Sequence, residues 1–223
     1  MEKIIFWDWT GTLVDESLLD QAVCQTIEEE LAAKKNITLS DAHSLFQEYL
    51  KSLENTWQWH DYILHGRNLG IDWKIPQEKN LEKLILLPHA EDILQHARDK
   101  GYKNVLATNA VRKVIELRVN HAGLLPLIDA IVASDDVYAL KSEGKHFTSG
   151  LKILNGNPRL SFSIGNNPVQ DILPAQRLHL KTILCDFGKE LTHYHSEHIS
   201  DNHKVAVSSD YRIHQLLEVM DII

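Results

Sequence analysis

The sequence predicts an α/β fold, in which a Rossmann-like doubly wound parallel sheet carries an inserted helical segment. Three observations predict it. An apolar run over residues 4–7 leads into Asp8 and a Thr-Gly-Thr turn, which is typical of a buried parallel strand. Helical spacing then dominates residues 15–87, and from Pro88 onward helical and strand patterns alternate. Because the insert separates the first strand from its sheet partners, we expect it to cover the carboxyl edge of the sheet.

The order of these patterns predicts two domains. Residues 1–14 and 88–223 form the predicted α/β core domain, and residues 15–87 form the predicted helical cap domain. In the cap, an apolar stripe predicts a helix from 18 to about 35, a second helix begins with Ser40 as its N-cap, and helical patterns follow at 57–69 and 81–87. The core pattern predicts helices at 90–100, 111–121, 147–154, 171–178 and from 211 onward, and strands at 104–107, 128–133, 160–164, 182–185 and 205–207.

Composition predicts a soluble globular protein that acts on a small molecule. The chain has 223 residues, of which 43% are hydrophobic and 24% charged, enough to bury a proper core. Its formal net charge of −8 includes no basic block, which argues against binding to nucleic acid or to an anionic membrane. No apolar run of about 18 residues occurs and the two cysteines lie far apart, so we expect a reducing, cytoplasmic location.

The turn after Asp8 is suited to chemistry on an oxyanion. In open α/β sheets, ligands bind beyond the carboxyl ends of the strands, and Asp8 stands at such an end. Gly11 permits a close approach of ligand to backbone, while the hydroxyls of Thr10 and Thr12 and nearby N–H groups can receive an oxyanion. We therefore expect Asp8 to be presented as a nucleophile.

Three further polar motifs follow predicted strands or precede helices. With the first loop, the four motifs are Asp8-Trp9-Thr10-Gly11-Thr12-Leu13, Val105-Leu106-Ala107-Thr108-Asn109, Lys141-Ser142-Glu143-Gly144-Lys145-His146-Phe147 and Gly165-Asn166-Asn167-Pro168-Val169-Gln170-Asp171. In this order they resemble the motifs of the haloacid dehalogenase-like (HAD) hydrolase superfamily. The resemblance extends over nearly the whole chain. Within the superfamily, the chain resembles the phosphoglycolate phosphatase-like branch, whose members have a helical C1-type cap, and its motifs are degenerate versions of the family's.

The resemblance implies Mg²⁺-dependent hydrolysis of a small phosphomonoester through an aspartyl-phosphate on Asp8. Thr108 would hydrogen-bond the transferring phosphoryl group, and Lys141 would balance its charge and orient Asp8, with Lys145 as a rival for that role. The implied metal ligands are Asp8, the Thr10 carbonyl, Asn166 and Asp171.

Substrate contacts are expected from Thr12 and Asn109 in the core and from His60 and Arg67 in the cap. We expect the protein to be a monomer or a homodimer.

Two departures from the family pattern bear on turnover. Thr10 occupies the position of the second Asp, which serves as general acid and base, and such a group is typically worth about 10² to 10⁴ in rate. Hydrolysis is therefore expected to be slow. Asn166 replaces a metal-binding Asp, and the loss of one negative charge predicts weaker Mg²⁺ binding.

Two other functions stay open at this point. A catalytically degenerate member would bind a phosphorylated ligand or a protein partner without turnover. A metal-independent haloacid dehalogenase would also lack the second Asp, but it uses a cap arginine, and Arg67, the only arginine between residues 15 and 87, comes later in the sequence. The cluster His193, His195, His198 and His203 lacks the spacing of a zinc site and predicts a solvated loop.

Overall fold

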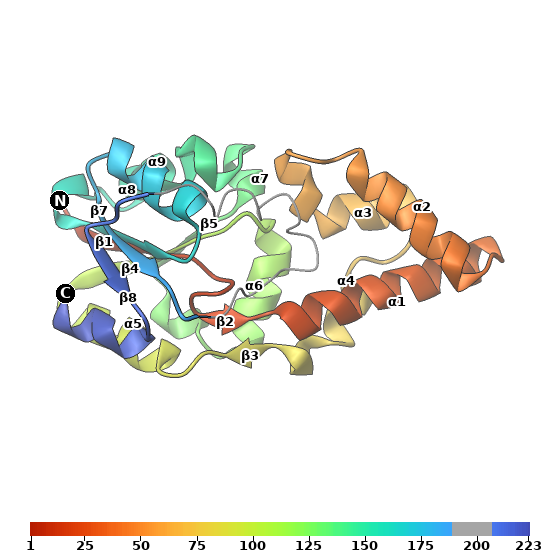
Figure 1. Ribbon diagram of the computed structural model, residues 1–223, viewed down its shortest axis with the longest axis horizontal. Helices are drawn as coiled ribbons and strands as arrows, with labels where there is room; N and C mark the ends of the chain where they lie inside the picture. The colour runs from red at the N-terminus through yellow and green to blue at the C-terminus, as the bar shows by residue number, and fades with distance from the viewer. Residues whose placement is uncertain (189–206) are drawn as a thin grey trace.

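The computed structural model describes residues 1–188 and 207–223, and its centre is a six-stranded parallel sheet (Figure 1). The strand order is β5-β4-β1-β6-β7-β8. After β1, the chain adds β4 and β5 on one side of it and then β6, β7 and β8 on the other. This doubly wound arrangement confirms the predicted fold class. The strands are β1 (Lys3–Trp7), β4 (Tyr102–Ala107), β5 (Ala130–Val132), β6 (Phe162–Gly165), β7 (Lys181–Cys185) and β8 (Tyr211–Ile213).

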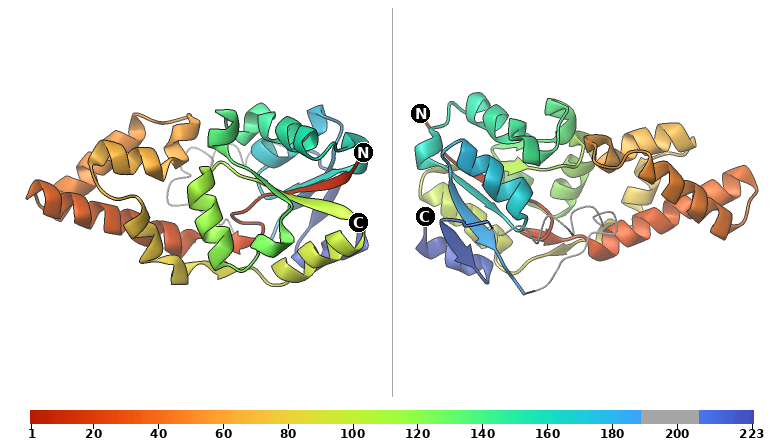
Figure 2. Two further views of the ribbon diagram at one scale, coloured as in Figure 1. Left: turned by 180° about the vertical axis from the view of Figure 1, so that it is seen from behind. Right: turned by 45° about the horizontal axis from the view of Figure 1, so that its top comes forward.

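Helices cover both faces of the sheet (Figure 2). Ile5 and Trp7 of β1 belong to the hydrophobic cluster with α5, α6 and η8, while Ile4 and Phe6 belong to the cluster with α8 and α9. Alternate side chains of β1 are thus buried on opposite faces, which explains its uninterrupted apolar sequence. The helices are α5 (Ala90–Asp99), α6 (Arg112–His121), α7 (Ser134–Val137), α8 (Lys145–Ile153), α9 (Leu173–Arg177) and η8 (Leu216–Asp221), with short helical turns η3 (Leu125–Leu127), η4 (Lys141–Glu143), η5 (Pro158–Leu160) and η6 (Pro168–Ile172).

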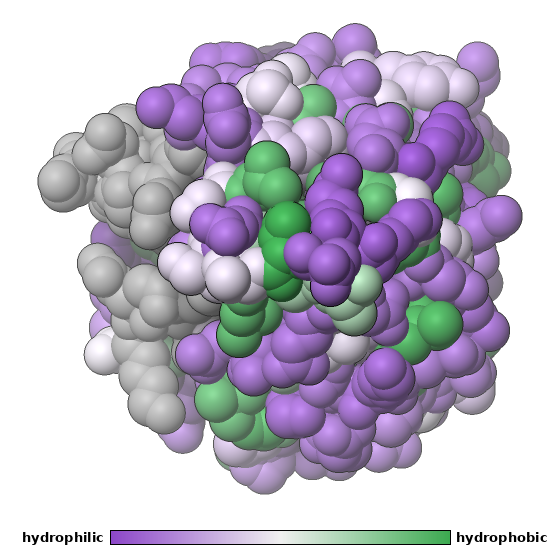
Figure 3. All heavy atoms as spheres, turned by 90° about the vertical axis from the view of Figure 1, so that its right-hand side faces the viewer, coloured by the Kyte–Doolittle hydropathy of each residue, from purple (hydrophilic) through white to green (hydrophobic). Residues whose placement is uncertain are grey.

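A helical segment extends to one side of the sheet, away from both termini (Figure 1). It has its own hydrophobic cluster, which continues onto Val111 and Val114 at the start of α6. The face of this segment seen in Figure 3 is mainly hydrophilic, with hydrophobic side chains in small areas. Its elements are α1 (Ser17–Lys35), α2 (Leu39–Lys51), η1 (Trp57–His60), α3 (Tyr62–Leu69), α4 (Lys74–Glu78) and η2 (Leu81–Lys83).

The helical segment joins the core through a two-stranded antiparallel stem. β2 (Val14–Asp15) pairs with β3 (Ile85–Leu86), where the chain leaves the core and returns to it. The prediction of helix over 81–87 is therefore wrong beyond Lys83. Short apolar runs do not distinguish strand from helix, and here the pairing with β2 decides.

Two other local predictions need correction. The final helix, predicted from Tyr211, begins at Leu216 as η8, because residues 211–213 form the edge strand β8, whose backbone pairs with β7 and which buries Ile213. The second helix is capped by Thr38, whose Oγ1 accepts a hydrogen bond from Asp41 N at 3.1 Å, and Ser40 lies inside it. The predicted strand at 205–207 lies mostly outside the described residues.

Across residues 1–188 and 207–223, no helix combines the length and apolarity needed to cross a membrane.

Candidate active site

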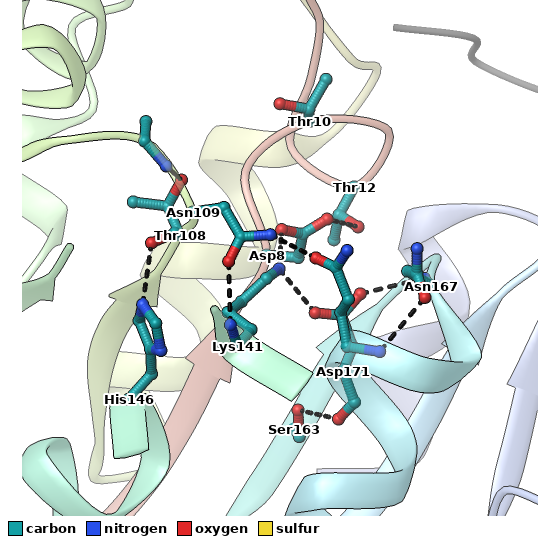
Figure 4. Close-up of polar contacts among 12 residues, drawn as sticks. Asp8, Thr10, Thr12, Thr108, Asn109, Lys141, His146, Ser163, Asn167 and Asp171 are labelled. Carbon is teal, nitrogen blue, oxygen red and sulfur yellow. Dashed lines mark hydrogen bonds and ion pairs between the residues drawn. The ribbon is translucent and has the colours of Figure 1, made fainter. Parts of the chain in front are cut away.

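Asp8 lies at the carboxyl end of β1, between the loops that follow β4 and β6 (Figure 4). Its backbone N–H donates to the carbonyl of Ile164 at 2.9 Å, which extends the parallel pairing by one residue. Only 8% of Asp8 is exposed. The parallel register therefore places a buried carboxylate at the edge of the sheet where such folds bind ligands.

Lys141 connects two carboxylates at this edge. Its Nζ donates to Asp8 Oδ1 and, at 2.6 Å, to Asp171 Oδ1. Burial lowers the pKa of Lys141, but Asp171 and Asp8 outweigh this effect and hold it above its ordinary value, so the amine is charged. Lys145, the rival in sequence, is exposed and pairs with Glu143 at 3.4 Å. The contact with Asp8 thus belongs to Lys141.

Asp171 is held as a buried carboxyl group. Its Oδ2 accepts the backbone N–H of Asn167 at 2.9 Å, and its backbone carbonyl accepts the hydroxyl of Ser163 at 2.7 Å. Burial and the charge of Asp8 raise its pKa to about 7, against the opposing effects of Lys141 and the Asn167 N–H. When Asp171 ionises, at about pH 7 and above, two carboxylates share the ammonium of Lys141 and negative charge is in excess.

Two threonines and a histidine complete the surroundings of Asp8. The hydroxyl of Thr12, fully buried, lies 3.4 Å from Asp8 Oδ2, so this residue orients Asp8. Thr108 Oγ1 accepts the N–H of Ala110 at 3.1 Å, which leaves its own proton available to another acceptor. His146 donates from Nε2 to the Thr108 carbonyl at 3.1 Å, and burial and Lys141 lower its pKa to about 3, so the imidazole is neutral.

Asn109 connects three loops of the site. Its Oδ1 accepts the backbone N–H of Lys141 at 2.8 Å, and its Nδ2 donates to Gln170 Oε1. The oxygen and one amide hydrogen thus have partners within the protein, which fixes the loop after β4 against those that carry Lys141 and Asp171.

Thr10 is directed toward the helical segment. Its Oγ1 donates to Glu16 Oε2 at 2.7 Å, and Glu16, 3% exposed, precedes α1. The hydroxyl proton of Thr10 is therefore engaged away from Asp8.

The donors available to a metal are oxygen atoms. Among the described residues no group of three or more His, Cys, Asp and Glu side chains is placed to hold a metal ion. Asp8 and Asp171 supply two carboxylates, and the amide of Asn166 lies so close to Gly11 that a Cβ there would be 2.1 Å from its Nδ2. Carboxylate, amide and carbonyl oxygens are ligand types that suit Mg²⁺.

The haloacid dehalogenase-like hydrolase family model matches residues 2–179. The chain belongs to this family of hydrolases. A glyceraldehyde 3-phosphate phosphatase of Pyrococcus abyssi is 26% identical over 203 residues, which is 85% of this chain and 83% of that protein. A ribulose-1,5-bisphosphate 5-phosphatase of Halopiger xanaduensis is 24% identical over 143 residues, 64% of this chain and 59% of that protein.

Solved structures show the same HAD fold. A HAD phosphatase from Thermococcus onnurineus has a TM-score of 0.82 at 23% identity, covering 99% of this chain and 97% of that one. The L-2-haloacid dehalogenase of Xanthobacter autotrophicus with chloropropionic acid covalently bound has a TM-score of 0.63 at 14% identity, covering 100% and 98%. Both the phosphatase and the dehalogenase thus share this HAD architecture.

The candidates in the helical segment lie apart from this cluster in sequence and differ in exposure. His60 is half-buried at the end of η1, and Arg67 is exposed in the last turn of α3. Their roles in substrate binding stay predictions. The neighbouring His65 is buried between Trp59 and Tyr49, bonding the carbonyl of the former and the hydroxyl of the latter, as a core residue would. The four histidines at 193–203 lie outside the described residues.

Sequence reasoning missed three residues that hold the site, namely Glu16, Arg118 and Gln170. Arg118 does carry a signal, since it continues the apolar stripe of Val114 and Ile115 on α6 and so predicts a buried cation. The other two carry none: the counter-charge of Glu16 is Arg118, 102 residues away, and the partner of Gln170 is Asn109, 61 residues away on another loop.

Proposed function

We propose that the protein is a phosphatase that hydrolyses a small phosphomonoester through an aspartyl-phosphate on Asp8, with Mg²⁺ as its cofactor. The observation that carries this proposal is the buried carboxylate of Asp8 at the end of β1, in contact with Lys141. The names of similar proteins support it, because glyceraldehyde 3-phosphate phosphatase and phosphoglycolate phosphatase each act on a small phosphate ester.

The contacts of Asp8 suggest how it would attack. Oδ1 is engaged by Lys141. Within residues 1–188 and 207–223, the hydrogen bond to Oδ2 is the 3.4 Å contact from Thr12, so we assign Oδ2 as the attacking atom. A bond would form between Oδ2 and phosphorus as the bond from phosphorus to the ester oxygen breaks, and the leaving alcohol would take a proton from solvent. Thr108 would donate to a phosphoryl oxygen, and Lys141 would offset its charge. Water would then hydrolyse the aspartyl-phosphate.

The proposed Mg²⁺ would be held by Asp8, Asp171, the Thr10 carbonyl and Asn166. When bound, it would neutralise charge on the phosphoryl group. A cation at this position would favour the ionised form of Asp171, in which Asp8 and Asp171 carry one negative charge more than Lys141 offsets. Because Asn166 is neutral, we expect a lower affinity than a third carboxylate would provide.

Slow turnover follows from the position of Thr10. A hydroxyl that donates to Glu16 does not protonate the leaving alcohol, and near neutral pH it is a poor base toward water. We also propose that residues 15–87 act as a cap over the substrate, with His60 and Arg67 as its candidate contacts.

The experiment is phosphate release from a panel of small phosphomonoesters, with Mg²⁺ or with EDTA. Asp8→Asn should abolish release, while Asp99→Asn, the same change on an exposed helix end, should leave it within about twofold. Mass spectrometry of the protein during turnover should find the phosphoryl group on the peptide that contains Asp8. Release that persists in Asp8→Asn would refute the aspartyl-phosphate route.

One observation favours a second candidate, metal-independent carbon–halogen hydrolysis. Lys141 already bridges Asp8 and Asp171, which reduces their repulsion without a metal ion. That function predicts halide release from 2-haloacids in EDTA. If neither phosphate nor halide is released, and phosphate esters still raise the Tm, the protein is a ligand-binding member of the family.

A further inference from the structure

The carboxylate of Glu16 accepts three hydrogen bonds in a buried position. Oε1 accepts the indole N–H of Trp9 at 2.6 Å and Nη1 of Arg118 at 2.8 Å, and Oε2 accepts the hydroxyl of Thr10 at 2.7 Å. Glu16 is also the N-cap residue of α1, yet its side chain does not cap the helix. Asp15 instead accepts the N–H of Ser17 at 2.9 Å. The Glu16 side chain is therefore committed to the loop that carries Asp8.

Arg118 extends this contact from the core into the helical segment. It lies on α6, is 3% exposed, and donates from Nη2 to Asp20 Oδ1 at 2.9 Å. Nε and Nη2 also donate to Gln77 Oε1 at 3.1 and 2.9 Å. With Glu16 and Asp20 ionised, the cluster carries two negative charges and one positive charge in a buried volume. Among the residues that the structure describes, this cluster holds no second cation to offset a further carboxylate.

We propose that Glu16 is a positioning residue for the nucleophile loop: it holds the Thr10 side chain on the helical segment, and this side of the loop accommodates a carboxylate at position 16 or at position 10 but not at both. The effect of Glu16 on catalysis rests on the proposed function of Asp8, whereas its effect on the position of the loop rests on its own contacts. Thr10 and Glu16 thus form a matched pair, since a donor at position 10 meets an acceptor at position 16.

The proposal predicts that the effect of Thr10→Asp depends on the residue at position 16. The aspartate would lose the donated hydrogen bond and would place a second carboxylate close to that of Glu16, where burial makes repulsion strong. In Glu16→Gln, the amide oxygen can still accept from Trp9 and Arg118, and the amide N–H can donate to a carboxylate at position 10. The double variant also restores the charge of the wild-type cluster.

The test is a double-mutant cycle of wild type, Thr10→Asp, Glu16→Gln and the double variant, read in EDTA by Tm and with Mg²⁺ by kcat and KM. Thr148→Asp, on the exposed side of α8, is the matched control for introducing an aspartate. We expect Thr10→Asp alone to lower the Tm by about 4 °C or more, and the loss to be at least halved in the Glu16→Gln background. In the Glu16→Gln background, we expect Thr10→Asp to raise kcat by about tenfold or more, with a small change in KM. With Glu16 present, we expect Thr10→Asp not to raise kcat.

Equal losses of Tm in the two backgrounds, or a rise in kcat from Thr10→Asp that is the same in both, would overturn the proposal. The Tm measurement needs no substrate. If no tested ester is hydrolysed by any variant, the proposed function fails while the Tm cycle still decides whether Glu16 and residue 10 are coupled.

Discussion

Replacing Lys141 by methionine should cost more stability than any surface lysine change, because it removes the cation shared by two buried carboxylates. The Lys141 side chain is 4% exposed, and those of Asp8 and Asp171 are 10% and 3% exposed. Removing one partner of a buried ion pair typically costs about 3 to 5 kcal/mol, since a buried charge is left uncompensated. For a chain of this length, that free energy corresponds to a fall in Tm of roughly 6 to 20 °C.

The assay is thermal unfolding followed by circular dichroism in EDTA, with phosphate release measured in parallel with Mg²⁺. Lys145→Met is the matched control, because that lysine pairs with Glu143 at 3.4 Å and both side chains are about half exposed. Exposed pairs contribute about 0 to 1 kcal/mol, so the control should lose less than about 4 °C. It should also keep its activity. A Lys141→Met variant that loses no more Tm than Lys145→Met would refute the view that Lys141 compensates a buried pair.

Three further outcomes are expected. The carboxyl of Asp171 stays protonated in the folded protein up to about pH 7 but ionises near pH 3.8 when unfolded, so its contribution to stability falls as the pH rises between these values. Urea unfolding in EDTA should therefore show that the free energy of unfolding declines less steeply with pH in Asp171→Asn than in wild type. Mg²⁺ should raise the Tm of wild type and fail to raise that of Asp171→Asn, and an equal rise in both would remove Asp171 from the proposed ligands. Gln170→Ala should cost about 1 to 3 kcal/mol in urea unfolding, because it deprives the buried Asn109 Nδ2 of its acceptor, whereas Gln95→Ala on the surface of α5 should cost far less.

The central sheet and the position of Asp8 were predictable because they depend on local patterns. Residues 4–7 are apolar without interruption because β1 is covered on both faces, and a Gly-containing turn marks where the strand ends. Strands and helices alternate along the rest of the chain, and each later motif stands at the end of a strand or at the start of a helix. In a parallel sheet the carboxyl ends of the strands meet at one edge, so Asp8, Thr108 and Asp171, which follow β1, β4 and β6, could be expected there. The place of Lys141 was expected from the resemblance of its motif to the family pattern.

Other features depended on pairing between distant segments. Residues 85–86 and 211–213 are short stretches whose own sequence does not exclude a helix, and their pairing with β2 and β7 makes them strands. The choice between Lys141 and Lys145 was likewise open, because both precede the helix predicted at 147–154.

By itself, the sequence determined the fold class, most of the helix and strand segments along the chain and the residue types that follow them, since strand and helix periodicity and turn residues act over a few positions. Only the tertiary structure decided that Glu16, rather than a residue beside Asp8, receives the Thr10 hydroxyl, and that Arg118, about a hundred residues later, compensates it. The physical reason is burial: a carboxylate without water must find its donors and its counter-charge among whatever segments the fold brings against it, and no local pattern encodes which these are.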